Sequence, residues 1–208
     1  DVRCLDAQWQ GDAWQATLHT PKGTIRTALH IAGRHNVTNA LAATACALAA
    51  GVAPDAVAQG LRAFAPVAGR SRALALTCQG RSVTVVDDCY NANPDSMHAA
   101  IEVLAELPAP RWLVLGDMGE VGSQGPQFHA EAGAHARSRG IERLLALGPL
   151  SAHAAQAFGP GAQHFDDKDA LLAAVRAALP EAGSVLVKGS RFMKMEQAVQ
   201  ALQEAACS

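Results

Sequence analysis

The sequence lacks the patterns that mark disulfide-rich, zinc-binding, membrane-spanning and nucleic-acid-binding proteins. Its five cysteines are an odd number and form no Cys-x-x-Cys pair, so we expect neither a disulfide framework nor a structural zinc site. No apolar run approaches the roughly 18 residues that a spanning helix needs. The net charge is only −2 and the charged residues are scattered, which argues against a nucleic-acid face or a membrane-surface helix. What remains is a globular protein.

Three kinds of catalytic motif are also missing. None of the four lysines is preceded by glycine or followed by serine or threonine, so there is no phosphate-binding loop of the Walker type. Ser71 and Ser190 have no histidine paired with them by pattern, so no nucleophile-base triad is indicated. Gly116-Asp-Met-Gly119 is only a weak cue for dinucleotide binding, because the Gly-x-Gly-x-x-Gly spacing is absent. Any ATP chemistry would therefore need residues from elsewhere.

The length and the start of the chain set further expectations. With 208 residues, of which 50% are apolar, the chain can build one large core or two small ones. It begins at Asp1 without a charged-then-apolar leader, so we expect no export signal, reduced cysteines and a cytoplasmic location. We also expect the chain to be an internal fragment of a longer protein.

The first third of the chain predicts a hairpin followed by two helices. Residues 1–12 are polar and mixed and predict no element, whereas 14–20 and 24–31 are strand-like runs joined by the turn-forming triplet Pro21-Lys22-Gly23. An alanine-rich helix follows with Asn36 as its N-cap. A second helix opens at Pro54, with Val57, Leu61 and Phe64 on its apolar face.

The start of the first of these helices is a candidate ligand site. It presents His35, Asn36 and Asn39 close to free backbone N–H groups, which suit anionic or hydrogen-bonding ligands. A structural explanation fits the same residues equally well: they cap the helix, and the histidine forms its hydrogen bonds within the protein.

The pattern changes after the breaker-rich segment 66–70 to a regular alternation of strands and helices. We place the domain boundary there, with domains 1–68 and 69–208. The predicted fold is α/β, with a Rossmann-like, mostly parallel sheet and helices on both faces. The predicted strands are 73–78, 82–87, 112–116, 143–147, 162–165 and 184–188, and the helices are 95–107, 126–139, 151–157, one through Leu171 to Leu179, and a last one with Phe192, Met195, Val199 and Leu202 inward.

Three of these strands end in polar loops, 87–93, 117–120 and 188–191. In an open parallel sheet, ligands bind beyond the carboxyl ends of the strands, so we expect the three loops to share one edge. Their carboxylates, amides, tyrosine, lysine and arginine suit a polar, charged substrate such as a nucleotide or an amino acid.

Each feature of this edge also has a structural explanation. Adjacent Asp87 and Asp88 point to opposite sides of a strand, so at most one faces a given ligand and the other can cap the next turn. Lys188 can be the solvated end of its strand. His129 and His135 are six residues apart, which is poor spacing for a shared metal, and a surface position is the simpler interpretation.

Five segments carry a resemblance to a known family, and they occur in the order seen in the Mur ligases. They are Gly33-Arg-His-Asn-Val-Thr-Asn-Ala-Leu-Ala-Ala43, Val67-Ala-Gly-Arg70, Asp87-Asp-Cys-Tyr-Asn-Ala-Asn-Pro-Asp-Ser-Met97, Leu113-Val-Leu-Gly-Asp-Met-Gly-Glu120 and Val187-Lys-Gly-Ser-Arg191. The third and fourth are most similar to the members that add D-alanyl-D-alanine. The resemblance implies that residues 1–68 are the end of the central ATPase domain and that 69–208 are the C-terminal Rossmann-like domain.

The resemblance also implies a reaction of peptidoglycan precursor synthesis. ATP, with Mg²⁺, phosphorylates the carboxylate of UDP-N-acetylmuramoyl-tripeptide, and the amine of D-alanyl-D-alanine attacks the acyl phosphate. The phosphate loop, the metal ligands and the carbamylated lysine of the family are not in this sequence, so we expect the fragment to be inactive alone. A ligase for another amino acid, or a non-catalytic module that binds a nucleotide or dipeptide, is the alternative.

The resemblance assigns roles to individual residues. Arg70, Asp88 and Lys188 would be catalytic. His35, Asn36, Asn39, Arg70 and Asp88 would bind the nucleotide, with the asparagines on the adenine side, Arg70 on the phosphates and Asp88 on the ribose. The dipeptide and acyl phosphate would contact Tyr90, Asn91, Asn93, Asp117, Lys188, Ser190 and Arg191.

Overall fold

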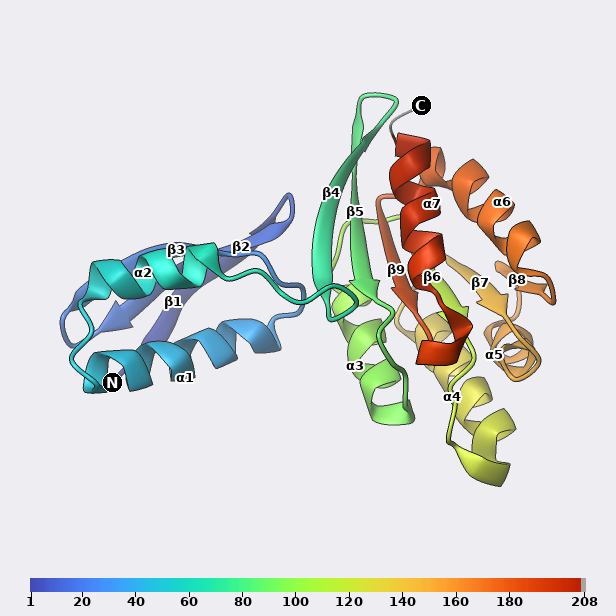
Figure 1. The fold of residues 1–208 in the computed structure, drawn as a ribbon, viewed down its shortest axis with the longest axis horizontal. Coiled ribbons are helices and arrows are strands. Elements are labelled where there is room, and N and C mark those ends of the chain that lie inside the picture. The colour runs from blue at the N-terminus through green and yellow to red at the C-terminus, as the bar shows by residue number, and fades with distance from the viewer. Residues whose placement is uncertain (207–208) are drawn as a thin grey trace. The chain divides into compact units, whose positions relative to one another are not determined.

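The computed structural model describes residues 1–206, which divide into two compact units, one of Asp1–Val67 and one that begins at Ala68. The N-terminal unit is a three-stranded antiparallel sheet with two helices packed on it (Figure 1). Its core joins Trp14, Leu18 and Leu29 of the sheet to Val37 and Val57 of the helices. Its elements are β1 (Arg3–Gln10), β2 (Ala13–Thr20), β3 (Gly23–Leu29), α1 (His35–Ala49) and α2 (Pro54–Ala63).

The predicted hairpin is present as β2 and β3, but β1 is a strand that the sequence pattern did not predict. Its pairing with β2 shifts between Cys4 and Asp6. Such a bulge inserts an extra residue and breaks the alternation of apolar and polar positions. The strand is therefore hard to recognise from its sequence.

Two details of the helices differ from the prediction. The N-cap of α1 is Arg34, not Asn36, and Asn36 lies inside the first turn with its Nδ2 donating to the carbonyl of Ala32 at 2.7 Å. Phe64 follows the end of α2 and is 50% exposed. The extended backbone of Phe64 takes its side chain off the helical repeat, so it does not join the apolar face.

The C-terminal unit is built on a six-stranded sheet in the order β4-β5-β9-β6-β7-β8. The β4–β5 pair is antiparallel and the other pairs are parallel. The predicted α/β fold with a mostly parallel sheet is confirmed. The strands are β4 (Arg72–Cys78), β5 (Arg81–Asp88), β6 (Arg111–Gly116), β7 (Arg143–Leu147), β8 (Ala162–Phe165) and β9 (Ser184–Lys188).

Helices cover both faces of this sheet, with α3, α4 and α5 on one side and α6 and α7 on the other (Figure 1). Trp112 and Val114 pack with the helices α6 and α7. Leu113 and Leu115 alternate with them and are fully buried on the opposite face. The helices are α3 (Pro94–Ala105), α4 (Gly125–Ser138), α5 (Ser151–Phe158), α6 (Lys168–Ala178) and α7 (Glu196–Ala206), with short 3-10 turns η1 (Gly122–Gln124), η2 (Leu179–Glu181) and η3 (Arg191–Met193).

Met195, Val199 and Leu202 are buried as predicted, whereas Phe192 is 63% exposed. Phe192 belongs to η3, and Lys194 has a left-handed backbone, φ 51°, before α7 begins. The helical spacing that was expected to bring Phe192 inward therefore does not extend back to it.

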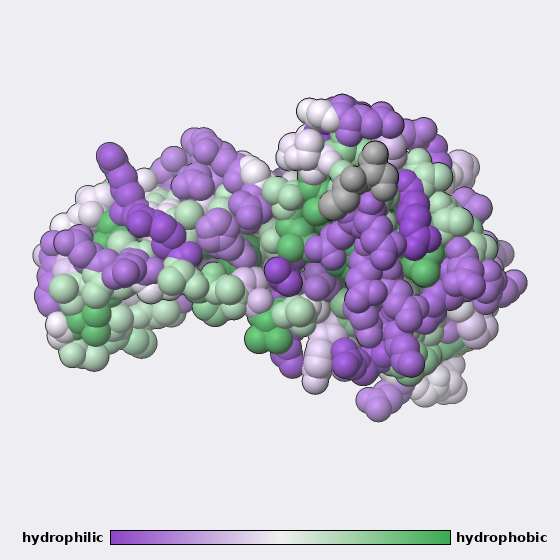
Figure 2. Space-filling view, turned by 45° about the horizontal axis from the view of Figure 1, so that its top comes forward, coloured by the Kyte–Doolittle hydropathy of each residue, from purple (hydrophilic) through white to green (hydrophobic). Residues whose placement is uncertain are grey.

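In the view of Figure 2, hydrophilic residues cover much of the C-terminal unit, whereas hydrophobic residues gather along the lower edge of the N-terminal unit. Among the described residues, no helix has both the length and the hydropathy that crossing a membrane requires.

Candidate functional site

Three loops meet at the carboxyl edge of the parallel strands, and Ser190 joins them. Its N–H donates to the carbonyl of Asp117 at 3.0 Å. Its Oγ accepts from the N–H of Gly119 at 2.6 Å and donates to the carbonyl of Ala92 at 3.2 Å. The loops that follow β5, β6 and β9 are thus held together by one buried hydroxyl, as the prediction of a shared edge required.

These loops enclose a cleft of about 800 Å³. The ring of Phe192 packs against Gly119, since a Cβ at Gly119 would lie 2.8 Å from that ring. The lining combines amides, aromatic rings, one acid and one base. It consists of Tyr90, Asn91, Ala92, Asn93, Pro94, Gly119, Glu120, Val121, Phe128, Ser190, Arg191 and Phe192.

Five of the predicted substrate residues belong to this lining, and two do not. Asp117 is 4% exposed and caps α5, accepting from the N–H and the hydroxyl of Ser151 at 2.7 Å each. Lys188 is 2% exposed. Glu120 was missed by the sequence prediction, although it closes one of the polar loops that the prediction identified. The other lining residues that it missed are Ala92, Pro94, Gly119, Val121, Phe128 and Phe192.

Asp87 and Asp88 hold the backbone on either side of Arg70. The Oδ2 of Asp87 accepts from the N–H of Gly69 at 2.9 Å, and the Oδ1 of Asp88 accepts from the N–H of Ser71 at 2.9 Å. Gly69 and Ser71 both have positive φ angles, 80° and 51°. The two carboxylates thus stabilise an unusual turn that presents Arg70.

The second oxygen of Asp88 pairs with Lys188, whose Nζ lies 2.6 Å away. The same Nζ donates to the carbonyl of Asn91 at 3.0 Å. Lys188 is therefore not a solvated strand end, because its ammonium is buried in a junction between β5 and β9.

Cys89 lies beside this junction and is not set up as a nucleophile. Burial, together with the hydrogen bond and negative charge of Asp87, raises the pKa of its thiol far above the ordinary value. Its Sγ donates to Asp87 Oδ1 at 2.8 Å. The thiol stays protonated at neutral pH and acts as a hydrogen-bond donor.

Two arginines converge on Tyr90, which is 44% exposed. The guanidinium carbons of Arg70 and Arg191 lie 4.2 Å and 5.6 Å from the centre of its ring. In the described part of the chain, neither guanidinium forms an ion pair with a carboxylate. Their charges are thus available to an anionic ligand, with Arg191 in the lining of the cleft and Arg70 over the ring of Tyr90.

His129 is fully buried, so the surface position expected for it is wrong. The N–H of Met118 donates to its Nε2 at 2.9 Å, and its Nδ1 donates to the carbonyl of Gly125 at 2.7 Å. Burial lowers the pKa of the imidazole. The ring is therefore neutral, and its 4.0 Å approach to Asp117 is not an ion pair. Through its hydrogen bond with the N–H of Met118, the imidazole anchors the loop that follows β6.

In the N-terminal unit, the start of α1 is a small network of its own side chains. Asn39 Nδ2 donates to Asn36 Oδ1 at 3.0 Å, and Asn36 Nδ2 lies 3.1 Å from His35 Nε2. His35 and Asn39 are exposed. A nucleotide contact by these three residues stays a prediction.

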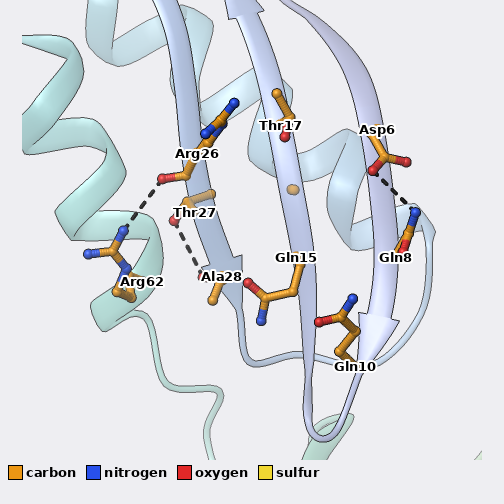
Figure 3. A pocket seen from close by; sticks show the side chains of 10 residues that line it. Asp6, Gln8, Gln10, Gln15, Thr17, Arg26, Thr27, Ala28 and Arg62 are labelled. Atoms are coloured by element: carbon orange, nitrogen blue, oxygen red, sulfur yellow. Dashed lines mark hydrogen bonds between the residues drawn. The ribbon is translucent and has the colours of Figure 1, made fainter.

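A second hollow, of about 270 Å³, lies on the outer face of the three-stranded sheet. Figure 3 shows Gln8, Gln10 and Gln15 projecting from adjacent strands and Arg62 donating to the carbonyl of Arg26. It includes none of the predicted site residues, and its long side chains form an open polar surface.

Comparison with known proteins identifies the family. The profile described as "Mur ligase, glutamate ligase domain" matches residues 69–191. The chain belongs to the Mur ligase family. All of the residues that line the cleft except Phe192 fall inside the matched region.

The chain resembles one branch of this family in particular. It is 42% identical over 190 residues to the UDP-N-acetylmuramoyl-tripeptide–D-alanyl-D-alanine ligase of Escherichia coli, covering 90% of this chain and 41% of the relative. The enzyme of the same name from Bacillus subtilis is 37% identical over 202 residues, covering 93% and 44%. The chain thus spans about two fifths of the length of these relatives.

Solved structures show the same similarity. A crystal structure of MurF from Acinetobacter baumannii matches with a TM-score of 0.80 and 32% identity, over 98% of this chain and 45% of that one. MurF from Thermotoga maritima in complex with ADP shares the fold, with a TM-score of 0.77 at 20% identity, over 99% of this chain and 47% of that one.

Proposed function

We propose that this chain is the C-terminal portion of an ATP-dependent ligase that adds D-alanyl-D-alanine to UDP-N-acetylmuramoyl-tripeptide in the cytoplasm, during peptidoglycan precursor synthesis. The observation that carries the proposal is a polar cleft lined by Arg191, with Arg70 beside it over the ring of Tyr90 and neither guanidinium paired with a described carboxylate. The two substrates carry phosphate and carboxylate charges that such a cleft accommodates. The family and the named relatives support the same reaction.

Arg70 is the residue best placed to act on phosphate. Its backbone is fixed on both sides by the hydrogen bonds of Gly69 and Ser71, while its guanidinium forms no ion pair with a described carboxylate. A preorganised guanidinium stabilises charge that develops on a transferring phosphoryl group without reorganising. Arg191, which lines the cleft itself, suits the carboxylate of the dipeptide.

Asp88 and Lys188 position Arg70 and the loop that follows β5. Both oxygens of Asp88 accept hydrogen bonds from the protein, so a ribose hydroxyl would have to use its remaining lone pairs. Lys188 orders the Asn91 carbonyl and Asp88 from a buried position. We assign both a positioning role toward Arg70 and the loop that follows β5.

The residues of this chain do not supply a complete site for Mg-ATP. The sequence has no phosphate loop. Within residues 1–206, no group of three or more His, Cys, Asp or Glu side chains could hold a metal ion. The triphosphate cradle and the metal ligands would belong to another part of a longer protein, with His35, Asn36 and Asn39 on the adenine side.

In the step that the cleft would serve, the dipeptide amine attacks the acyl carbon of the phosphorylated tripeptide. A C–N bond forms, the C–O bond to phosphate breaks, phosphate leaves with the electron pair, and the amine loses a proton. In this proposal the residues that line the cleft orient the amine, and Arg70, over the ring of Tyr90, stabilises the leaving charge.

The test is a pair of assays of phosphate release with ATP, magnesium, UDP-N-acetylmuramoyl-tripeptide and D-alanyl-D-alanine. The chain alone should release essentially none. A chimera in which this chain replaces the matched region of the Escherichia coli relative should release phosphate only when the dipeptide is present. A chimera that folds and binds substrates without turnover would instead favour a non-catalytic binding module.

A further inference from the structure

Glu120 is an unusual residue in the cleft. It is the only acid among the residues that line it, and Arg191 is the only base. Its side chain is exposed, and within the described part of the chain no hydrogen bond or ion pair engages its carboxylate. A free carboxylate and a free guanidinium therefore face one cavity.

The backbone of Glu120 is in the left-handed region, with φ 59°. This conformation costs a residue with a Cβ about 1 kcal/mol, and glycine or asparagine usually occupies it. Glutamate gains nothing here from packing, because it is exposed. Strain of this kind, held by surrounding structure, is typical of positions that present a functional group.

The surrounding structure does hold this position. The N–H of Met118 is bound by buried His129, and the N–H of Gly119 by buried Ser190. Asp117 anchors the start of the same loop to α5. Three successive residues before Glu120 are thus fixed to three different elements, and they direct its carboxylate to the cleft.

We propose that Glu120 binds the amino group of the dipeptide while Arg191 binds its carboxylate. This proposal rests on the function proposed above and adds the basis of its selectivity, since a zwitterion with charges at its two ends matches a cleft with one acid and one base. The bound ammonium loses one proton to water before attack, and the amine so formed still donates an N–H to Glu120 while its lone pair is free to attack. The pair therefore selects a free dipeptide and orients its nucleophile.

All lining residues lie within this chain, so binding can be measured on the chain as it is, by NMR titration of the Gly119 and Ser190 amide signals. Three ligands separate the contributions: D-alanyl-D-alanine, its N-acetyl derivative, and its C-terminal amide. Glu120→Gln should lower the affinity for D-alanyl-D-alanine about fivefold or more. A loss of this size is in the range of a partly exposed charge-assisted hydrogen bond. The substitution should leave the weaker binding of the N-acetyl derivative unchanged.

Two further variants serve as controls. Glu120→Gly removes the carboxylate and relieves the left-handed strain, so it should fold at least as well as the parent and lose the same affinity. Glu131→Gln removes an exposed acid of α4 that is outside the cleft and should change no affinity.

The outcomes distinguish the two proposals. If the parent chain binds D-alanyl-D-alanine and Glu120→Gln binds it equally well, the role of Glu120 is wrong while the proposed function stands. If the parent binds none of the three ligands, the dipeptide site itself is wrong and the assignment of Glu120 is overturned with it.

Discussion

The ammonium of Lys188 lies 2.6 Å from Asp88 Oδ2, with the two side chains 3% and 16% exposed. This pair links the ends of β5 and β9 beneath the cleft. Lys188→Met should destabilise the C-terminal unit by about 3–5 kcal/mol, because it leaves a largely buried carboxylate without its counter-ion. Urea unfolding measures the loss. Lys194→Gln, at an exposed lysine of the same region, is the control. If both variants lower the free energy of unfolding by the same small amount, the pair does not stabilise the fold.

Arg70 should matter for turnover more than for stability. In the active chimera, Arg70→Ala should lower turnover about 100-fold, as the loss of an electrostatic stabiliser of the transition state does. Arg72→Ala, at an exposed position at the start of β4, should change it less than about threefold. Steady-state phosphate release gives both values. A loss below about threefold for Arg70→Ala would make its role structural.

Buried His129 should make the fold sensitive to mild acid. Burial lowers its pKa from the ordinary 6.5, and the groups facing it are Asp117 and His153. Between the ordinary and the lowered pKa, the unfolded chain binds a proton that the folded chain does not, so the free energy of unfolding falls as the pH drops below about 6.5.

His129→Gln removes this titration, and the dependence of stability on pH should become shallower below pH 6.5. One proton corresponds to at most about 1.4 kcal/mol per pH unit. Urea unfolding of both proteins at several pH values between about 7.5 and 5 measures the slopes. Identical slopes would mean that His129 titrates alike in the folded and unfolded states.

The contact between α4 and α5 depends on Gly133. A Cβ at this position would overlap the backbone carbonyl of Ala154. Gly133→Ala should therefore destabilise the C-terminal unit by about 2 kcal/mol or more, since backbone cannot move aside as a side chain can. Gly60→Ala, in α2 with open space around it, should stabilise by about 0.5–1 kcal/mol. Thermal unfolding should show the two opposite shifts.

The regular part of the fold could be predicted from the sequence. The strands 143–147, 162–165 and 184–188 have the predicted bounds, because each is a short run bounded by glycine, proline or polar residues. The common edge of the three polar loops also follows from sequence, since parallel strands place their carboxyl ends together. The lining role of Tyr90, Asn91 and Asn93 depends on that geometry.

The sequence could not predict the hydrogen bonds that side chains form with backbone groups. The partners of His129 are the N–H of Met118 and the carbonyl of Gly125, and neither leaves a trace in side-chain pattern. The bonds of Asp87 and Asp88 to the turn around Arg70 are of the same kind. The lining position of Glu120 follows from a left-handed backbone next to Gly119, which a polar loop sequence does not specify.

We propose above that the cleft of this chain belongs to a ligase for D-alanyl-D-alanine. The most direct measurement is mass spectrometry of the nucleotide product made by the chimera with ATP, magnesium, UDP-N-acetylmuramoyl-tripeptide and a mixture of D-alanyl-D-alanine and single amino acids. A product heavier by one D-alanyl-D-alanine unit, and by no single amino acid, is the predicted result. Addition of a single amino acid would contradict the proposal. So would an unchanged nucleotide substrate in a parallel assay in which the Escherichia coli enzyme is active.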